Sequence, residues 1–127
     1  MSTDITTPGA ASWIQYTGPN AAAAKQFYKD VMGWTIADMP MQDGSNHSAI
    51  MVGDGPIGGF APQEEATGAW TVYITVTDVD SATKKAKAAG AEILVEPMDA
   101  PGVGRMATIR DPQGARIALI TYESMQG

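Results

Sequence analysis

The chain has 127 residues, the size of one ordinary domain, with 44% hydrophobic and 17% charged residues. Fourteen acidic against eight basic residues give a net charge of −6, the wrong sign for holding nucleic acid phosphates. No apolar run approaches the ~20 residues that span a bilayer, and residues 1–12 lack the basic start and apolar core of a secretory signal. The absence of cysteine excludes disulfides and thiolate chemistry. We therefore expect a cytoplasmic protein without nucleic acid or membrane partners.

The first half of the chain predicts a β-α-β-β-β module. In ASWIQYTG the residues alternate like those of a half-buried strand, with Trp13, Gln15 and Thr17 on one face. Asn20 is expected to cap a helix over AAAAKQFYKDVM, which Gly33 ends. The periodicity predicts that this helix packs inward through one stripe, made of Ala23, Ala24, Phe27, Val31 and Met32. Three short strands follow, at WTIAD, HSAIMV and IGGFA.

The second half predicts the same order of elements. After the strand WTVYITV, Asp78 is expected to cap a helix that Gly90 ends. Its predicted inner stripe consists of Val79, Ala82, Ala86 and Ala89. Three more strands are expected at AEILVE, RMATIR and ARIALITY, separated by a Pro/Gly loop, PMDAPGVG, and by a DPQG turn. We take Asp111 of that turn as structural.

The spacing of glycine and proline supports an internal duplication. Seven residues separate Gly33 from Pro40, and seven separate Gly90 from Pro97. We expect one domain of two modules, about 11–61 and 70–122, with a linker over 62–69. The predicted fold is α+β, in which two tandem β-α-β-β-β modules form a curved mixed sheet with a concave pocket and helices on the outside. Function is then expected in the pocket.

Three segments resemble the vicinal oxygen chelate superfamily, which includes glyoxalases, bleomycin-resistance proteins and extradiol dioxygenases. They are FYKDVMGW, WTVYITVTDVDSATKKAKAAGA and PGVGRMATIRDPQGARIALI. Together with the repeated module order, they extend the resemblance from about Ser12 to Tyr122. The resemblance implies the fold given above. It does not name one activity, because the superfamily contains many chemistries and some plain binding proteins.

The catalytic members that this chain resembles hold a divalent metal with His, Gln or Glu side chains from the first and last strand of each module. The resemblance places those four positions on Trp13, Gly59, Thr71 (or Ala69) and Ala118. None of these side chains is a usual metal ligand, and Gln15 alone cannot replace the hydration shell of a divalent ion. We therefore expect no metal and no cofactor.

Strand alternation predicts which side chains face the pocket. The expected ligand-binding set combines aromatic rings, hydroxyl groups and an amide on one face of the sheet, whereas Trp70, Ile117 and Leu119 face the helices. Arg105, after the PGVG turn, is a candidate for anchoring a carboxylate. The predicted ligand-binding residues are Trp13, Gln15, Thr71, Tyr73, Thr75, Arg105, Ala118 and Tyr122.

Three functional hypotheses remain open from the sequence. The favoured one is metal-independent binding of a small organic molecule, as in the bleomycin-resistance branch. The alternative is a metal-dependent lyase, isomerase or dioxygenase in which Gln15, His47 and a carboxylate such as Glu123 converge. A third is a metal-free enzyme with Tyr73 or His47 as acid or base and Arg105 as anion clamp. A homodimer is expected in each case, because curved sheets leave edges and apolar faces that a two-fold partner covers.

Overall fold

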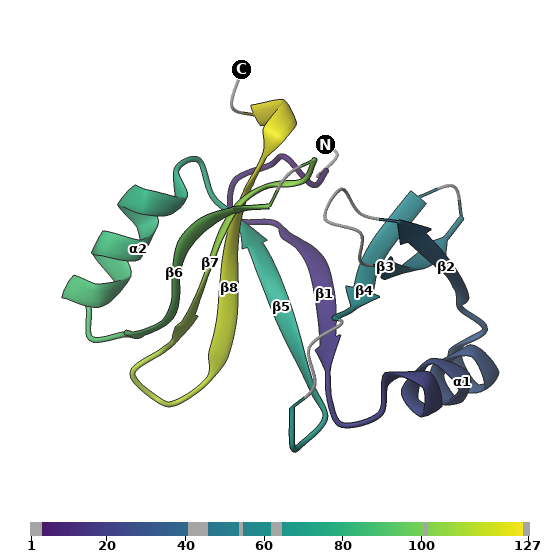
Figure 1. Ribbon diagram of the computed structural model, residues 1–127. Helices are drawn as coiled ribbons and strands as arrows, with labels where there is room; N and C mark the ends of the chain where they lie inside the picture. The colour runs from purple at the N-terminus through teal and green to yellow at the C-terminus, as the bar shows by residue number, and fades with distance from the viewer. Residues whose placement is uncertain (1–3, 41–45, 54, 62–64, 101, 126–127) are drawn as a thin grey trace. The chain divides into compact units, whose positions relative to one another are not determined.

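A computed structural model describes residues 4–40, 46–53, 55–61, 65–100 and 102–125. Within these ranges the chain forms eight strands, two α-helices and a short 3-10 helix, which together give the predicted α+β fold (Figure 1). The chain separates into two compact units, one formed by residues 13–71 and the other by residues 1–12 with 72–127. Each unit is described by itself below.

The unit 13–71 contains most of the first β-α-β-β-β repeat. Its elements are β1 (Ala11–Thr17, of which the first two residues belong to the other unit), α1 (Ala21–Met32), β2 (Thr35–Pro40), β3 (Asn46–Val52) and β4 (Gly55–Phe60). In this unit the strands lie in the order β2-β3-β4-β1. Strand β1 runs parallel to β4, and the other neighbours are antiparallel.

The other unit contains most of the second repeat. Its elements are β5 (Ala69–Thr75, which begins in the first unit), α2 (Val79–Ala88), β6 (Glu92–Ala100), β7 (Gly104–Arg110), β8 (Arg116–Tyr122) and the 3-10 helix η1 (Glu123–Met125). Its strands lie in the order β5-β8-β7-β6, with β5 parallel to β8. The two units therefore share one order of elements and one pattern of strand directions.

Helix α1 has the predicted ends but not the predicted inner face. The Asn20 side chain accepts a hydrogen bond of 3.0 Å from the Ala23 amide, and Gly33 ends the helix in a left-handed conformation with φ 71°. The predicted stripe is wrong, because Phe27, Val31 and Met32 are 56%, 59% and 54% exposed. None of the residues of α1 is fully buried.

Tyr28 is the residue of α1 that packs inward, onto a cluster of aromatic rings. Its ring centroid lies 5.2 Å from that of Trp70 and 5.7 Å from that of Trp34, and Trp70 Nε1 donates a hydrogen bond of 3.1 Å to Tyr28 Oη. Tyr16 and Phe60 complete the cluster, at 5.3 and 5.8 Å from Trp70. Aromatic side chains bury more area than aliphatic ones and keep a polar tip for a hydrogen bond, so Tyr28 displaces the aliphatic stripe from the interface. The prediction that Trp70 packs against a helix is confirmed.

Helix α2 is held by a small aliphatic core. Asp78 caps it by accepting a hydrogen bond of 3.2 Å from the Ser81 amide, as predicted. Val79 is 1% exposed and Thr83 6% exposed, whereas Ala89, which was predicted to face inward, is exposed. Thr83 was not predicted as a core residue; its hydroxyl can be buried because it donates to the Val79 carbonyl at 2.7 Å.

Strand β6 extends beyond the predicted strand. The sequence PMDAPGVG was expected to form a loop, but β6 continues through Pro97 to Ala100, with irregular register against β7 near Val95. It is the outermost strand of its unit, so it pairs on one side only. A proline is tolerated there because the missing N–H group need not serve a second neighbour.

Candidate functional site

Helix α2 covers one face of the sheet β5-β8-β7-β6 and leaves the opposite face to other groups. Arg105 on β7 binds Asp80 of α2, which identifies the helix-covered face. The cross-strand register places Tyr73 beside Ala118 and Ala118 beside Thr108, on the opposite side from Arg105. We call this opposite side the Tyr73 face. It consists of Tyr73 and Thr75 on β5, Met106, Thr108 and Arg110 on β7, and Arg116, Ala118, Ile120 and Tyr122 on β8.

Two of the predicted ligand-binding hydroxyl groups on this face are bound within the protein. Ser12 Oγ lies 2.8 Å from Tyr122 Oη and 2.8 Å from Thr75 Oγ1, and the Thr75 hydroxyl also donates to the Ile5 carbonyl. Thr75 is fully buried. Burial raises the pKa of Tyr122, and the hydrogen bond between Ser12 and Tyr122 partly offsets that rise. These two side chains therefore shape the face and fix the N-terminal segment to it.

Among the predicted ligand-binding residues, Tyr73 is the one whose hydroxyl group is best placed to donate a hydrogen bond to a ligand. It is half-buried, and the interactions found among the described residues include no hydrogen bond to its hydroxyl. Burial raises its pKa above the ordinary value of 10.0, an effect that the positive charge of Arg116 opposes and that Tyr122 reinforces. The phenol is therefore protonated at neutral pH and can donate a hydrogen bond to a ligand.

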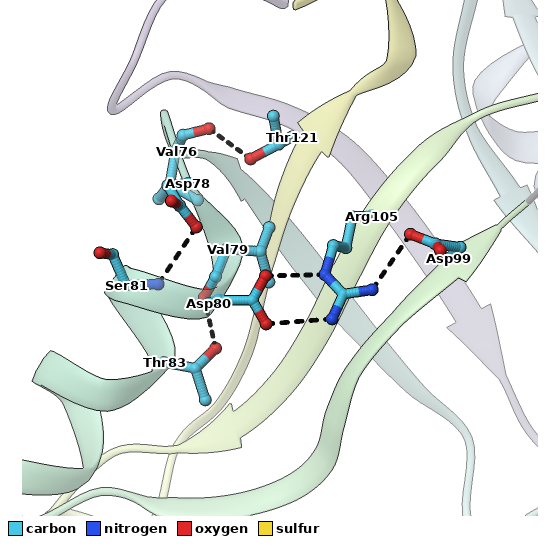
Figure 2. A network of polar contacts seen from close by, with 9 residues as sticks. All are labelled: Val76, Asp78, Val79, Asp80, Ser81, Thr83, Asp99, Arg105 and Thr121. Atoms are coloured by element: carbon cyan, nitrogen blue, oxygen red, sulfur yellow. Dashed lines mark hydrogen bonds and ion pairs between the residues drawn. The ribbon is translucent and has the colours of Figure 1, made fainter. Parts of the chain in front are cut away.

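Arg105 lies on the helix-covered face, where two carboxylates already bind it. Its Nε and Nη2 atoms donate to the two oxygens of Asp80 at 2.9 and 3.0 Å, and Nη1 donates to Asp99 at 3.1 Å (Figure 2). The hydrogen bonds from Arg105 lower the pKa of Asp80, and those to Asp80 and Asp99 raise the pKa of Arg105. Bidentate pairs of this kind fix geometry well, and here the pair ties α2 to β7 and β6. The two carboxylates thus occupy the donors of Arg105 that the sequence analysis assigned to a ligand carboxylate.

In the unit 13–71, the predicted residues Trp13 and Gln15 lie on the sheet face away from α1. Tyr16, their neighbour on β1, contacts Tyr28 of α1, so strand alternation directs Trp13 and Gln15 to the other side. Trp13 Nε1 donates a hydrogen bond of 2.7 Å to Gln15 Oε1. Both side chains are half-buried, and Thr71 is 6% exposed. Their role as ligand contacts stays a prediction.

The residues at the four positions that the resemblance assigns to metal ligands do not fit a divalent ion. Gly59 lies beside Gln15 and Ala118 beside Tyr73 in the strand register, so neither last strand supplies a carboxylate there. Among the residues that the structure describes, no group of three or more His, Cys, Asp or Glu side chains is placed to hold a metal. Glu123, part of the alternative ligand set, accepts a hydrogen bond of 2.9 Å from the Gly102 amide. His47 lies in β3, and its side chain is outside the described residues.

Arg116 is the residue of the Tyr73 face that sequence reasoning missed. It is the first residue of β8, separated from the DPQG turn by Ala115, and it is half-buried. The turn is as predicted, since Asp111 Oδ1 accepts hydrogen bonds from the Gln113 and Ala115 amides. The signal that could have found Arg116 is its spacing: it precedes Ala118 by two residues and therefore shares its face.

Comparison with known proteins agrees with this fold. The family model described as Glyoxalase/Bleomycin resistance protein/Dioxygenase superfamily matches residues 10–119. The chain belongs to this superfamily. The resemblance to the vicinal oxygen chelate proteins is thereby confirmed.

Curated members of the superfamily resemble the chain along most of its length. It is 34% identical over 121 residues to the Mycobacterium tuberculosis protein named "Putative glyoxylase CFP32", covering 94% of this chain and 46% of that protein. It is 33% identical over 137 residues to the anthracycline biosynthesis protein DnrV of Streptomyces peucetius, covering 94% and 50%. The chain thus spans about half the length of these relatives.

Solved structures of the superfamily share the fold. A Streptomyces coelicolor methylmalonyl-CoA epimerase superposes with a TM-score of 0.65 at 15% identity, covering 94% of this chain and 98% of that one. At this identity the likeness establishes the fold alone. A search of the described residues finds no helix long and apolar enough to cross a membrane.

Proposed function

We propose that this chain is a metal-independent binding protein for a small organic molecule, similar to the bleomycin-resistance branch of its superfamily. The observation that carries the proposal is the set of side chains at the strand positions that the resemblance assigns to metal ligands. These positions carry Trp13, Gly59, Thr71 and Ala118, while the neighbour of Ala118 is the half-buried phenol of Tyr73. A face with a protonated donor and no carboxylate at the ligand position suits binding better than metal-assisted catalysis.

The apolar part of the Tyr73 face supports the same function. The half-buried Met106 lies beside Met98, which is 51% exposed, whereas Ile120 on the other side of Met106 is already buried. Thioether side chains adapt to ligands of different shape. A small molecule with a flat or apolar body would cover these side chains while Tyr73 donates a hydrogen bond to its polar end.

Elemental analysis of the purified chain, after expression with added Zn²⁺, Mn²⁺, Ni²⁺ or Co²⁺, tests the metal part of the proposal. We expect no stoichiometric metal and the same melting temperature with and without EDTA. One equivalent of tightly held metal would instead support the alternative, a metal-dependent lyase, isomerase or dioxygenase.

A thermal-shift screen of aromatic and heteroaromatic compounds tests the binding part. A ligand present at a hundred times its Kd should stabilise the folded chain by about 2.7 kcal/mol, which raises the melting temperature by several degrees. A Tyr73→Phe variant should respond less to the same ligands. If no compound of a broad panel stabilises the chain, the binding function is wrong.

We further propose that the chain works as a cytoplasmic homodimer. The lack of cysteine agrees with a reducing compartment. The exposed side chains of Phe27, Val31 and Met32 on α1 offer an apolar stripe that a second copy would cover. Sedimentation equilibrium tests this: a dimer mass that Phe27→Glu reduces to a monomer mass supports it, and a monomer at every concentration overturns it.

A further inference from the structure

We propose that residues 4–10 form a strap over one end of the Tyr73 face, and that a ligand displaces this strap by bringing a neutral carbonyl oxygen to the Thr75 hydroxyl. The inference rests on the proposed binding function, and it names the class of ligand and a device that regulates access to the same site. Its basis is the way in which Thr75 holds the N-terminal segment.

Thr75 binds the strap through three of its polar groups. Its hydroxyl donates to the Ile5 carbonyl, its carbonyl accepts a hydrogen bond of 2.7 Å from the Gly9 amide, and its amide donates to the Ala10 carbonyl at 2.9 Å. The Thr75 side chain belongs to the Tyr73 face, so the Ile5 carbonyl lies at the Thr75 end of that face. Thr75 is fully buried, whereas Tyr73 is only half-buried. The strap therefore occupies one end of the proposed site.

Little apolar packing holds the strap in place. None of residues 4–10, all of which the structure describes, is fully buried, and the side chain of Ile5 is 50% exposed. A hollow of about 410 Å³ lies between Pro8 and Gly9 of the strap and the first turns of α2, around Ser81 and Ala82. Segments with few buried apolar contacts open locally, at a free energy well below that of global unfolding. We expect the strap to open while the rest of its unit stays folded.

Thr75 can release the strap without leaving its own hydroxyl unsatisfied. A threonine hydroxyl has one proton to donate, and two acceptors lie within its reach: the Ile5 carbonyl and Ser12 Oγ, the latter at 2.8 Å. When the strap leaves, the hydroxyl turns to Ser12. A buried donor without an acceptor would otherwise oppose the opening. The place of the Ile5 carbonyl is therefore open to exchange between the strap and a ligand.

The place of the Ile5 carbonyl also defines the chemistry of the ligand. A single hydroxyl donor on a fully buried residue holds this carbonyl, so the group that takes over the same hydrogen bond must be an acceptor. A neutral carbonyl oxygen fits better than a carboxylate, because a buried charge is costly unless another charge pairs with it. The strap thus acts as an internal mimic of such a ligand.

Gly9 allows the strap to be loosened without a change on the Tyr73 face. Its φ of 92° lies in the left-handed region, and a Cβ atom placed on it meets nothing within 4 Å. Gly9→Ala should therefore strain only the closed conformation of the strap. Gly114, in the DPQG turn, has nearly the same φ, 96°, and the same free space. Gly114→Ala is the matched control, because it introduces a similar strain outside the strap.

Hydrogen exchange of the Thr75 amide, which donates to the Ala10 carbonyl, measures how often the strap opens. Gly9→Ala should speed this exchange roughly fivefold or more, because residues with a Cβ atom rarely adopt a left-handed conformation. Gly114→Ala should leave the exchange at the wild-type rate. If both variants speed the exchange alike, the amide exchanges by unfolding of the whole unit, and the strap is overturned.

Calorimetric titration with acetophenone and with ethylbenzene tests the ligand class, because the two probes have nearly the same shape and only acetophenone has a carbonyl oxygen. The wild-type chain should bind acetophenone about fivefold more tightly than ethylbenzene. Gly9→Ala should tighten acetophenone binding by the factor by which it speeds the exchange, because the strap competes for the same donor. Thr75→Val, which removes the donor, should abolish the preference for acetophenone.

The outcomes separate this inference from the proposed function. If both probes bind equally, or if acetophenone binds no more tightly to Gly9→Ala than to the wild type, the inference is overturned while small-molecule binding stands. If neither probe binds although other compounds of the panel stabilise the chain, the inference is also overturned. If no compound binds at all, both proposals fail. Circular dichroism and the melting temperature of each variant show whether it is folded.

Discussion

The two units of this chain use one order of elements but hold their helices by different means. Helix α1 has no fully buried residue and rests on a cluster of rings through Tyr28, whereas α2 buries Val79 and Thr83 and is tied to β7 and β6 through Arg105. The two helices occupy the same place in the order of elements, but the side chains that hold them against their sheets are of different kinds. A repeated architecture can therefore survive while its interior is rebuilt.

Removing the centre of the aromatic cluster should have the largest effect. Trp70→Ala deletes a ring that contacts Tyr16, Tyr28, Trp34 and Phe60, so we expect the free energy of unfolding to fall by about 3 kcal/mol in urea titrations. Trp70→Phe keeps a six-membered ring but loses the smaller ring of the indole and its hydrogen bond to Tyr28, and should cost less than half as much. Equal losses for the two variants would show that the hydrogen bond, and not ring packing, holds α1.

The corresponding change beneath α2 should cost somewhat less. Val79 is 1% exposed, and Val79→Ala removes two buried methyl groups, which should lower the free energy of unfolding by about 2 kcal/mol. Thr83→Val is the control, because it keeps the shape while its hydroxyl serves only a carbonyl within the helix. A larger loss for Thr83→Val than for Val79→Ala would contradict an apolar core in this unit.

The ion pair between Arg105 and Asp80 should make the stability of the chain sensitive to acid. Arg105 lowers the pKa of Asp80 below 3.8, so this contribution is complete above the unfolded-state pKa and is lost as the pH falls through the folded-state pKa. In urea titrations over a pH series, the wild type should therefore exceed Asp80→Asn in stability at neutral pH by a margin smaller than either core effect. The margin should shrink as the pH falls below the unfolded-state pKa and disappear once it passes the folded-state pKa of Asp80. A margin that is independent of pH would show that the pair is not ionic.

The smallest effect is expected for the stripe that the periodicity had placed inside. Phe27 is 56% exposed, so Phe27→Ala should change the free energy of unfolding by about 0.5 kcal/mol or less in dilute solution. At higher protein concentration, where the proposed homodimer would cover the stripe, the loss should grow; the same small loss at every concentration would contradict that dimer surface.

The sequence predicts helix caps and turns correctly, but it does not predict which side chains pack together over long distances. Asn20, Gly33, Asp78 and Asp111 act where predicted, because a cap or turn depends on a few consecutive residues. The inner face of α1 was missed because two stripes fit the helical period, and only the distant ring of Trp70 decides between them.

The candidate site shows the same division. Tyr73 and Ala118 share a face, as the alternation predicts. The sequence does not predict which face Arg105 occupies, because β7 follows a Pro/Gly segment that hides where the alternation begins. Arg116 begins β8 one residue after the turn, and its place on this face follows from its two-residue spacing to Ala118.

The equal spacing of glycine and proline in the two halves has a consequence for how the sheets end. Pro40 lies in β2 and Pro97 in β6, each the outermost strand of its unit. A residue without an N–H group interrupts the row of donors that an incoming strand would need, and Glu92, Glu96 and Asp99 add charge along β6. Both repeats therefore place a proline in their outermost strand. This proline hinders the addition of further strands that would lead to a fibril-like sheet.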